Sequence, residues 1–254
     1  MKESGRRKWA PAVRKGTGGG SANGANVVGP KAKAKSEAST DKVGTKIADL
    51  ICAERWAEAR ALIEKALKKE PRNHWLLSQL GETYYEERDY KKALTILLES
   101  RDILPDCPLT LWYLANTLDA LGQHTPALQL YQWLLTNRRT PEDDPCWESA
   151  EWTDALKTDC VFRIGLCSQH LGRMDRAAHA FRKYIDIVEL GIEGSYSVDD
   201  VRRRLAGLHE NGRDAAEREL RDTADWVMRE SGDGALVDAP PPLDDRSLRH
   251  LQKA

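Results

Sequence analysis

Two cysteines and one histidine stand close enough in the sequence to raise the question of metal or thiol chemistry. Cys160 and Cys167 are seven residues apart, which places both on one face of a helix, and His170 follows one turn later. A structural zinc site needs four ligands in close spacings such as Cys-x2-Cys, and no second pair of this kind exists. Nothing orients the histidine as the base of a catalytic cysteine. We therefore interpret both thiols as small apolar residues of a buried helix face and predict no metal site.

The remaining candidates for catalysis are two pairs of adjacent aspartates, Asp143-Asp144 and Asp199-Asp200. Adjacent carboxylates are typical of turns and helix N-termini, and no His or Lys converges on these. A glycine-rich stretch over residues 16–21 lacks the Gly-Lys-Ser/Thr that completes a phosphate-binding loop. The sequence thus predicts a protein that is not an enzyme and that needs no cofactor.

The stretch between residues 40 and 141 matches itself at a shift of 34 residues. The recurring positions are Leu80-Gly81 with Leu114-Ala115, Pro71 with Pro105, and Ala59 with Ala93 and Ala127. A period of this length marks an array of stacked helical hairpins, in which each unit buries its apolar face against the next.

The second of these units shows the hairpin most clearly. We expect one helix over residues 75–86 and another over 90–103, with Pro105 ending the second. The first helix carries an apolar stripe at helical spacing, made of Leu77, Leu80, Gly81 and Tyr84. Small residues at Gly81 and Ala93 predict close contact between the two helices.

The period also sets the expected organisation of the whole chain. A disordered basic tail over 1–40 precedes a repeat domain over 41–210, and a C-terminal helix and tail fill 211–254. We place the repeats at about 40–73, 74–107, 108–141 and 158–191, with an insertion at 142–157. Two further helices, at about 198–208 and 213–229, are expected to cap the array.

The repeats resemble the tetratricopeptide repeat (TPR) family. The residues that carry the pattern are Leu80-Gly81, Tyr84, Tyr90, Ala93, Leu97 and Pro105, then Leu114-Ala115, Gly122, Ala127 and Tyr131, then Gly165, Gly172, Ala177 and Phe181. The signature Trp of the family is absent from its usual place. The resemblance implies an all-α solenoid, a right-handed superhelix of about four helix-turn-helix repeats with C-terminal capping helices. It also implies a non-enzymatic scaffold that binds a partner peptide or domain in a concave groove.

In that family the first helix of each repeat lines the groove. Carried over by spacing, the predicted groove residues are Trp75, Gln79, Glu82, Tyr85, Glu86, Trp112, Tyr113, Asn116, Asp119, Phe162 and Arg163. Their aromatic rings would anchor a partner, and Glu82, Glu86 and Asp119, with Asp159 beside them, predict a basic or amphipathic ligand. A second reading stays open, in which the acids form a solvated helix face and the tyrosines pack between repeats.

Charge is divided unequally along the chain. Residues 1–40 carry nine Lys and Arg against Glu3 and Glu37, a net of +7, so the total of −1 leaves −8 for the rest. The tail is rich in Gly, Ala, Ser and Lys, so it is predicted to be disordered. Its cations suggest an alternative function, in which the tail binds nucleic acid or an anionic surface and the repeats recruit a protein.

Composition sets the remaining expectations. Five cysteines, an odd number, predict reduced thiols and no disulfide framework. No apolar run approaches the roughly 20 residues that cross a bilayer, and none follows the basic N-terminus as in a secretory signal, so we expect a cytoplasmic protein. Self-association through Trp147, Trp152 or Trp226 stays open.

Overall fold

A computed structural model gives the fold, and it describes residues 42–141, 144–210, 240–241 and 243. Every regular element within these ranges is a helix, as the repeat period predicts. The expected disordered tail over 1–40 and the expected helix at about 213–229 lie outside the described residues, as does nearly all of the predicted tail over 211–254.

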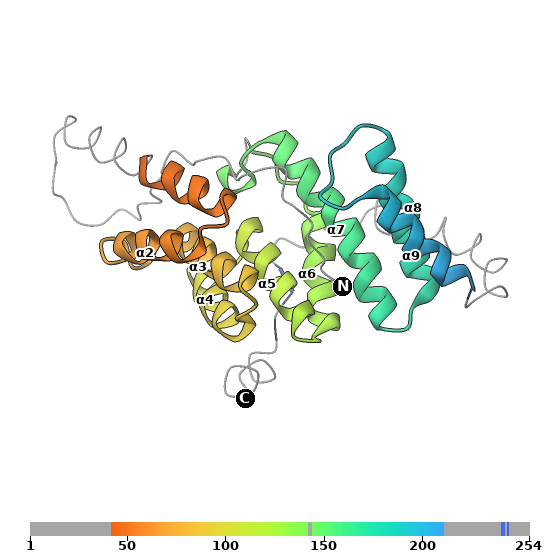
Figure 1. The fold of residues 1–254 in the computed structure, drawn as a ribbon, viewed down its shortest axis with the longest axis horizontal. Coiled ribbons are helices and arrows are strands. Elements are labelled where there is room, and N and C mark those ends of the chain that lie inside the picture. The colour runs from red at the N-terminus through yellow and green to blue at the C-terminus, as the bar shows by residue number, and fades with distance from the viewer. Residues whose placement is uncertain (1–41, 142–143, 211–239, 242, 244–254) are drawn as a thin grey trace.

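The described helices form one continuous array. They are a first helix over residues 42–52, α2 (Trp56–Leu67), α3 (His74–Glu86), α4 (Tyr90–Ile103), α5 (Pro108–Ala120), α6 (His124–Thr136), the short 3₁₀ helix η1 (Pro145–Trp147), α7 (Ala150–His170), α8 (Met174–Glu189) and α9 (Val198–Glu210). Figure 1 shows them stacked in chain order from one end of the molecule to the other. Each α-helix from α2 onward packs on the next α-helix along the chain, and α3 also packs on α5, which makes the all-α solenoid of TPR type that the repeats predict.

Local sequence signals explain where several helices begin and turn. The side chains of Asn73, Asp89 and Ser149 accept hydrogen bonds from backbone N–H groups in the first turns of α3, α4 and α7. Gly122 and Gly172 have φ of +77° and +73° in the turns that follow α5 and α7, a conformation that favours glycine. The expected bounds of α4 are confirmed, and α3 begins one residue earlier than expected.

The predicted insertion at 142–157 is shorter than the sequence indicated. Its second half is helical, because α7 begins at Ala150 and extends the first helix of the fourth repeat. Ser149 caps this helix, and Trp152 and Leu156 lie four residues apart on a buried face of it. Trp147, in η1, is fully buried. Both tryptophans therefore serve the core, and neither is exposed for self-association.

The core falls into two clusters of buried side chains. A small one joins the helix over 42–52 to α2 and α3, and a large one runs from α4 to α9. Leu243, far along the chain, belongs to the large cluster and is 9% exposed. In the described part of the chain, no helix is long and apolar enough to cross a membrane.

Two glycines let paired helices approach closely. A Cβ at Gly81 would lie 2.6 Å from Cγ of Leu97, and a Cβ at Gly165 would lie 2.5 Å from Cε1 of Phe181. Leu97 and Phe181 are fully buried and cannot swing into solvent. The small residue of the repeat pattern is therefore a packing requirement at both positions.

Replacing Gly165 by Ala is expected to lower the free energy of unfolding by up to about 2 kcal/mol. An overpacking cost of about 1–3 kcal/mol outweighs the gain of about 1 kcal/mol in helix propensity. Adding Phe181→Leu should make the double variant less destabilised than the sum of the two single changes, because a smaller side chain leaves room. Urea unfolding of the two single variants and of the double variant measures these free energies.

Gly207→Ala in α9 is the matched control for the Gly165 prediction. Among the described residues, no atom beyond its chain neighbours and the adjoining helix backbone lies within 4 Å of a Cβ at Gly207, so this change should raise the free energy of unfolding by up to about 1 kcal/mol. Stabilisation by Gly165→Ala to the same extent would contradict the close contact between α7 and α8.

Candidate functional site

The inner face of α3 carries the first group of predicted groove residues. Trp75, Gln79, Glu82 and Glu86 are spaced four, three and four residues apart, which places them on one face of the helix. Gln79 and Glu82 are fully buried, Trp75 is half-buried and Glu86 is exposed. This strip therefore runs from a covered end near Trp75 to an open end at Glu86.

Two side chains on this strip have buried polar atoms that the described residues do not satisfy. Neither Oε1 nor Nε2 of Gln79 has a hydrogen-bond partner in the described part of the chain, and neither does Nε1 of Trp75. A buried polar group without a partner costs about 1–3 kcal/mol. The side-chain amide of Gln79 and the indole N–H of Trp75 are thus poorly matched to the protein's own interior.

The predicted groove residues on α5 are occupied by contacts inside the protein. The ring of Trp112 meets that of Tyr131 edge-on at 5.7 Å, and the hydroxyl of Tyr131 donates to Oδ1 of Asn116 at 2.7 Å. Tyr113 is buried, with its ring centroid 6.3 Å from that of Tyr85 on α3. These residues hold neighbouring helices together, as the alternative reading of the tyrosines allowed.

The loop between α8 and α9 covers the predicted groove residues on α7. Tyr196 stacks on Phe162 with ring centroids 3.8 Å apart, and its hydroxyl accepts a hydrogen bond from Nε of Arg163 at 2.7 Å. Sequence reasoning missed Tyr196, because it lies in a linker with no repeat position. The available signal was an aromatic residue just before the capping helix.

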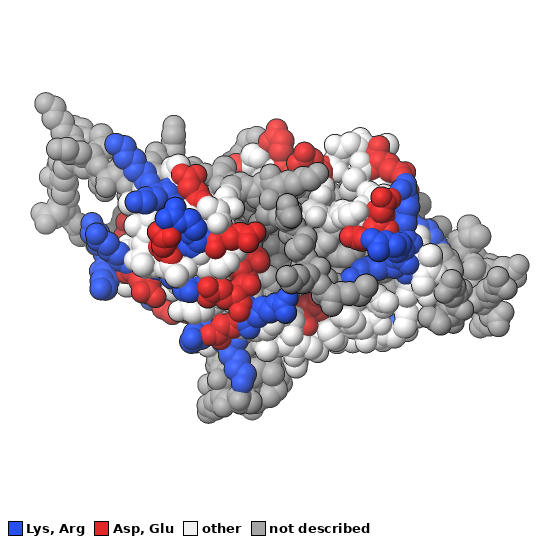
Figure 2. Space-filling model, in the orientation of Figure 1, with Lys and Arg blue, Asp and Glu red and all other residues white. Residues whose placement is uncertain are grey.

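The predicted acidic field is mostly internal. Asp119 Oδ1 lies 2.7 Å from Nδ1 of His124 and accepts a hydrogen bond from the Cys167 thiol at 3.4 Å. Asp159 is buried, Glu82 is fully buried, and Glu86 alone of the four acids is exposed. Figure 2 shows acidic and basic side chains interspersed over the first helices and over α9. Three of the four predicted acids therefore lie inside the fold, and the preference for a basic or amphipathic ligand stays a prediction.

The cysteines and the histidine on α7 do not form a common site. Cys160 and Cys167 are buried as expected, and burial raises the pKa of both, which favours the protonated thiols. His170 is half exposed, and its ring lies against that of His124 with the centroids 4.3 Å apart and the planes tilted by 42°. None of the five cysteines, all of which lie in the described ranges, forms a disulfide.

Comparison with known proteins identifies the repeats. Residues 50–109 and residues 159–187 each match a family model described as tetratricopeptide repeat. The chain therefore carries tetratricopeptide repeats. Such repeats build protein-interaction scaffolds, and this is the class of function that the match supports.

Two solved structures resemble this TPR array. One is "MamA 41-end from Desulfovibrio magneticus RS-1", with 15% identity, a TM-score of 0.50, and coverage of 82% of this chain and 100% of that one. The other is "MamA RS-1 ArsTM double mutant", with the same identity, TM-score and coverage of this chain, and 99% of its own length covered. This likeness concerns the fold alone. No curated protein matches the chain.

A second cluster of functional groups lies where the TPR hairpins meet the insertion. His74 opens α3, Cys107 precedes α5 as its N-cap, and Cys146 belongs to η1. Sγ of Cys146 lies 3.8 Å from Nε2 of His74. The pKa of Cys107 is lowered well below its ordinary value, chiefly by a hydrogen bond with Cys146 and less by one with His74, against the effect of burial.

Sequence reasoning missed this cluster because its members are far apart in the chain. The separations are 33 residues from His74 to Cys107 and 39 from Cys107 to Cys146. The first separation is one short of the TPR period, so both residues stand at the start of the first helix of adjacent repeats. That correspondence was the signal by which they could have been found.

Asp159 is expected to make the stability of the TPR array depend on pH. Burial raises its pKa to about 6, although the Ser195 backbone N–H and hydroxyl donate to its two oxygens at 2.8 and 2.6 Å. The folded state therefore holds this proton to a higher pH than the unfolded chain. Stability should fall as the pH rises from about 4 to about 6 and stay level above.

Asp159→Asn is expected to remove this slope. The amide oxygen can accept from the Ser195 N–H, its NH₂ can donate to the Ser195 hydroxyl, and it never ionises. The free energy of unfolding at pH 7 should rise by as much as about 3 kcal/mol, since one pKa unit is about 1.4 kcal/mol. Urea unfolding between pH 4 and 7 measures it. The exposed Asp154→Asn on the same helix is the control, and an equal slope in the Asp159→Asn variant would refute the assignment.

Proposed function

We propose that this chain is a non-enzymatic scaffold that docks a segment of a partner protein against the inner face of α3. The docking surface consists of Trp75, Gln79, Tyr85 and Glu86. The observation that carries the proposal is the Gln79 side-chain amide, which is fully buried and has no hydrogen-bond partner in the described part of the chain. The groove predicted over three repeats is thereby narrowed to its N-terminal part.

Hydrogen bonding favours a polypeptide as the docked molecule. A peptide main chain carries both N–H and C=O groups, and the Gln79 amide offers both an acceptor oxygen and a donor nitrogen. A partner that makes both hydrogen bonds removes an unfavourable term of about 1–3 kcal/mol from the free scaffold. Partner binding would then be favoured because it supplies the hydrogen bonds that the Gln79 amide lacks in the unbound protein.

The aromatic residues beside Gln79 supply apolar contact. Trp75 and Tyr85 are each half-buried, so part of each ring remains available. Rings of this kind carry much of the binding energy at protein interfaces. Because Glu86 is the single exposed acid among the four considered, the partner segment is selected by main-chain hydrogen bonds and apolar contact more than by positive charge.

The remaining predicted groove positions support this narrower surface. The α5 residues contribute to packing between repeats, and Tyr196 covers Phe162 and Arg163. A partner lying along α7 would have to displace that loop and break its hydrogen bonds. At α3 part of Trp75 and of Tyr85 is already exposed, and only the cover over the buried Gln79 amide has to open.

Photo-crosslinking tests where the partner lies. A benzoylphenylalanine in place of Tyr85 replaces one aromatic ring by another on the proposed surface, and the same residue in place of the exposed Glu99 on α4 is the control. In an extract of the native host, irradiation should join one protein to the Tyr85 position and not to the Glu99 position. Equal adducts at the two positions, or none at Tyr85, would overturn the proposal.

A further inference from the structure

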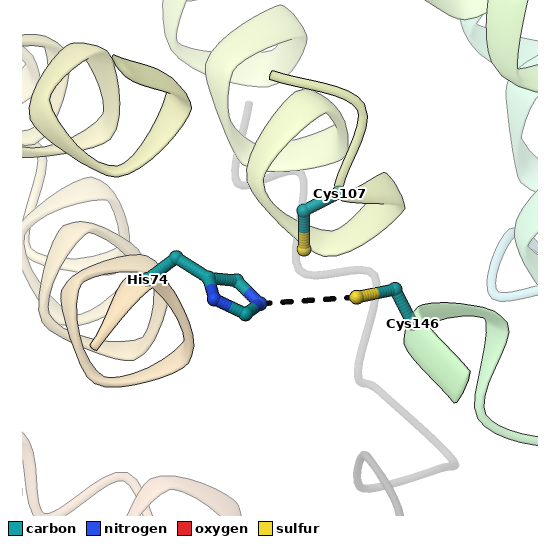
Figure 3. Close-up of side chains that lie close together, drawn as sticks. All are labelled: His74, Cys107 and Cys146. Carbon is teal, nitrogen blue, oxygen red and sulfur yellow. Dashed lines mark hydrogen bonds between the residues drawn. The ribbon is translucent and has the colours of Figure 1, made fainter. Parts of the chain in front are cut away.

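His74, Cys107 and Cys146 bring three metal-ligand atoms together from three separate elements. The two sulfurs and a ring nitrogen all lie within 4.8 Å of one another. Figure 3 shows the His74 ring and the Cys146 side chain pointing toward each other, with the Cys107 sulfur beside them. Both cysteines are buried and the histidine is half-buried, so the cluster is reached from the histidine side.

The fold holds each of the three residues independently. Asn73 caps α3 directly before His74, and Cys107 is itself the N-cap of α5. The backbone N–H of Cys146 donates to Oδ1 of Asp144 at 2.8 Å. The guanidinium of Arg139 pairs with Asp106 and also lies 3.6 Å from Asp144, which ties the insertion to the turn before α5.

The spacing fits a tetrahedral cation. With bonds of about 2.3 Å to sulfur and about 2.0–2.1 Å to nitrogen, tetrahedral geometry places a cysteine sulfur about 3.6 Å from a histidine nitrogen. The distance between Cys146 Sγ and His74 Nε2 is 3.8 Å. The Cys107 sulfur needs to move by no more than about 1 Å to complete the same geometry.

We propose that His74, Cys107 and Cys146 bind one Zn²⁺ ion per chain, with a water molecule in the fourth tetrahedral position. Two thiolates and one imidazole are soft and borderline donors that suit Zn²⁺ and suit Mg²⁺ or Ca²⁺ poorly. A thiolate at Cys107 is also favoured by its place at the positive end of the α5 helix. The proposal is independent of partner docking on α3.

The other close group of ligand-type side chains is a poorer cation site. It comprises Asp119, His124 and His170. Oδ2 of Asp119 lies 3.8 Å from Nη1 of Arg163, so a bound cation would sit beside a permanent positive charge. The acceptor Oδ1 is already within 2.7 Å of His124.

Metal binding would fasten the insertion to the repeats. One ion would connect the start of α3 and the start of α5, which belong to adjacent repeats, with η1, which belongs to the insertion. Both cysteines bind the ion as thiolates, so protons compete with Zn²⁺ and affinity falls as the pH is lowered. A site with three protein ligands keeps one position open for exchange of its water.

Titration with Co²⁺ and then Zn²⁺ tests the site in the full chain after reduction and removal of metals. We expect one Co²⁺ per chain, a thiolate-to-cobalt charge-transfer band, and loss of that band when Zn²⁺ displaces Co²⁺. Cys107→Ser and Cys146→Ser should each weaken binding by at least about 10-fold. Ser is a better helix cap than Cys, so Cys107→Ser keeps α5 and separates metal loss from unfolding.

Two further readouts keep the outcome decisive. Zn²⁺ should raise the midpoint of thermal unfolding of the wild type but not of the Cys107→Ser variant, because only the folded wild-type site binds it. Cys160→Ala removes a buried thiol from α7 and should leave Co²⁺ binding unchanged. The proposal is overturned if the wild type shows no charge-transfer band, if the band survives in the Cys107→Ser, Cys146→Ser double variant, or if the two cysteines form a disulfide and bind no metal once reduced.

Discussion

Trp147→Ala is expected to lower the free energy of unfolding by about 3–5 kcal/mol. The Trp147 side chain is fully buried, and η1 lies between α5 and α7, so its removal leaves a large cavity that these helices cannot close. The substitution also removes the indole ring over which Nζ of Lys157 lies, 5.5 Å from the ring centroid. Urea unfolding of the purified chain measures the change.

Trp147→Phe is the matched variant. Phe fills much of the same space and lacks the indole Nε1–H, which has no hydrogen-bond partner in the described part of the chain. We expect Trp147→Phe to lower the free energy of unfolding by less than half as much as Trp147→Ala does. A loss below about 1 kcal/mol for Trp147→Ala would mean that the insertion is not integrated into the core.

Gln79→Leu is expected to have opposite effects on stability and on partner binding. Leu has nearly the same size, and it removes a buried amide that nothing in the described chain satisfies. The free energy of unfolding of the unbound protein should therefore rise by about 1–2 kcal/mol, as when an unpaired polar group is replaced by an apolar one. If the Gln79 amide served the internal structure alone, Gln79→Leu would instead lower the free energy of unfolding.

The neighbouring Ser78 provides the contrast for this stability measurement. Its hydroxyl lies 2.6 Å from that of Thr110 and 3.0 Å from that of Ser100, in a buried cluster with its hydrogen bonds made. Ser78→Ala should lower stability by about 1–2 kcal/mol, since it leaves those hydroxyls with fewer partners. Destabilisation by Gln79→Leu to the same extent would show that the Gln79 amide is satisfied in the free protein.

The fold was predictable because one period organises it. Two residues that are 34 apart occupy the same packing position in adjacent repeats. The repeat pattern is therefore supported twice by small residues, once at Gly81 and Ala115 and once at Ala93 and Ala127. The end of α4 was expected from Pro105, and the structure shows that Asp89 caps its start. The insertion obeys no period, and its helical half was missed because the packing of Trp152 on the core decides it.

The candidate site was less predictable, since register identifies a face but not what covers it. Tyr196 comes from a linker outside the repeats, and its stacking on Phe162 depends on how the α8–α9 loop folds back. Burial of Asp159 likewise depends on Ser195 in that loop. The approach of Cys146 to His74 joins residues 72 apart, a distance at which sequence spacing carries no information about contact.

The most direct test of the docking surface is the dissociation constant of the captured partner for three forms of the scaffold, measured by titration calorimetry. The partner should bind Gln79→Leu about 10–100-fold more weakly than wild type, which corresponds to about 1.4–2.8 kcal/mol. Glu99→Lys, an exposed change on α4, should bind like wild type. An unchanged dissociation constant for a folded Gln79→Leu variant would contradict docking against the inner face of α3.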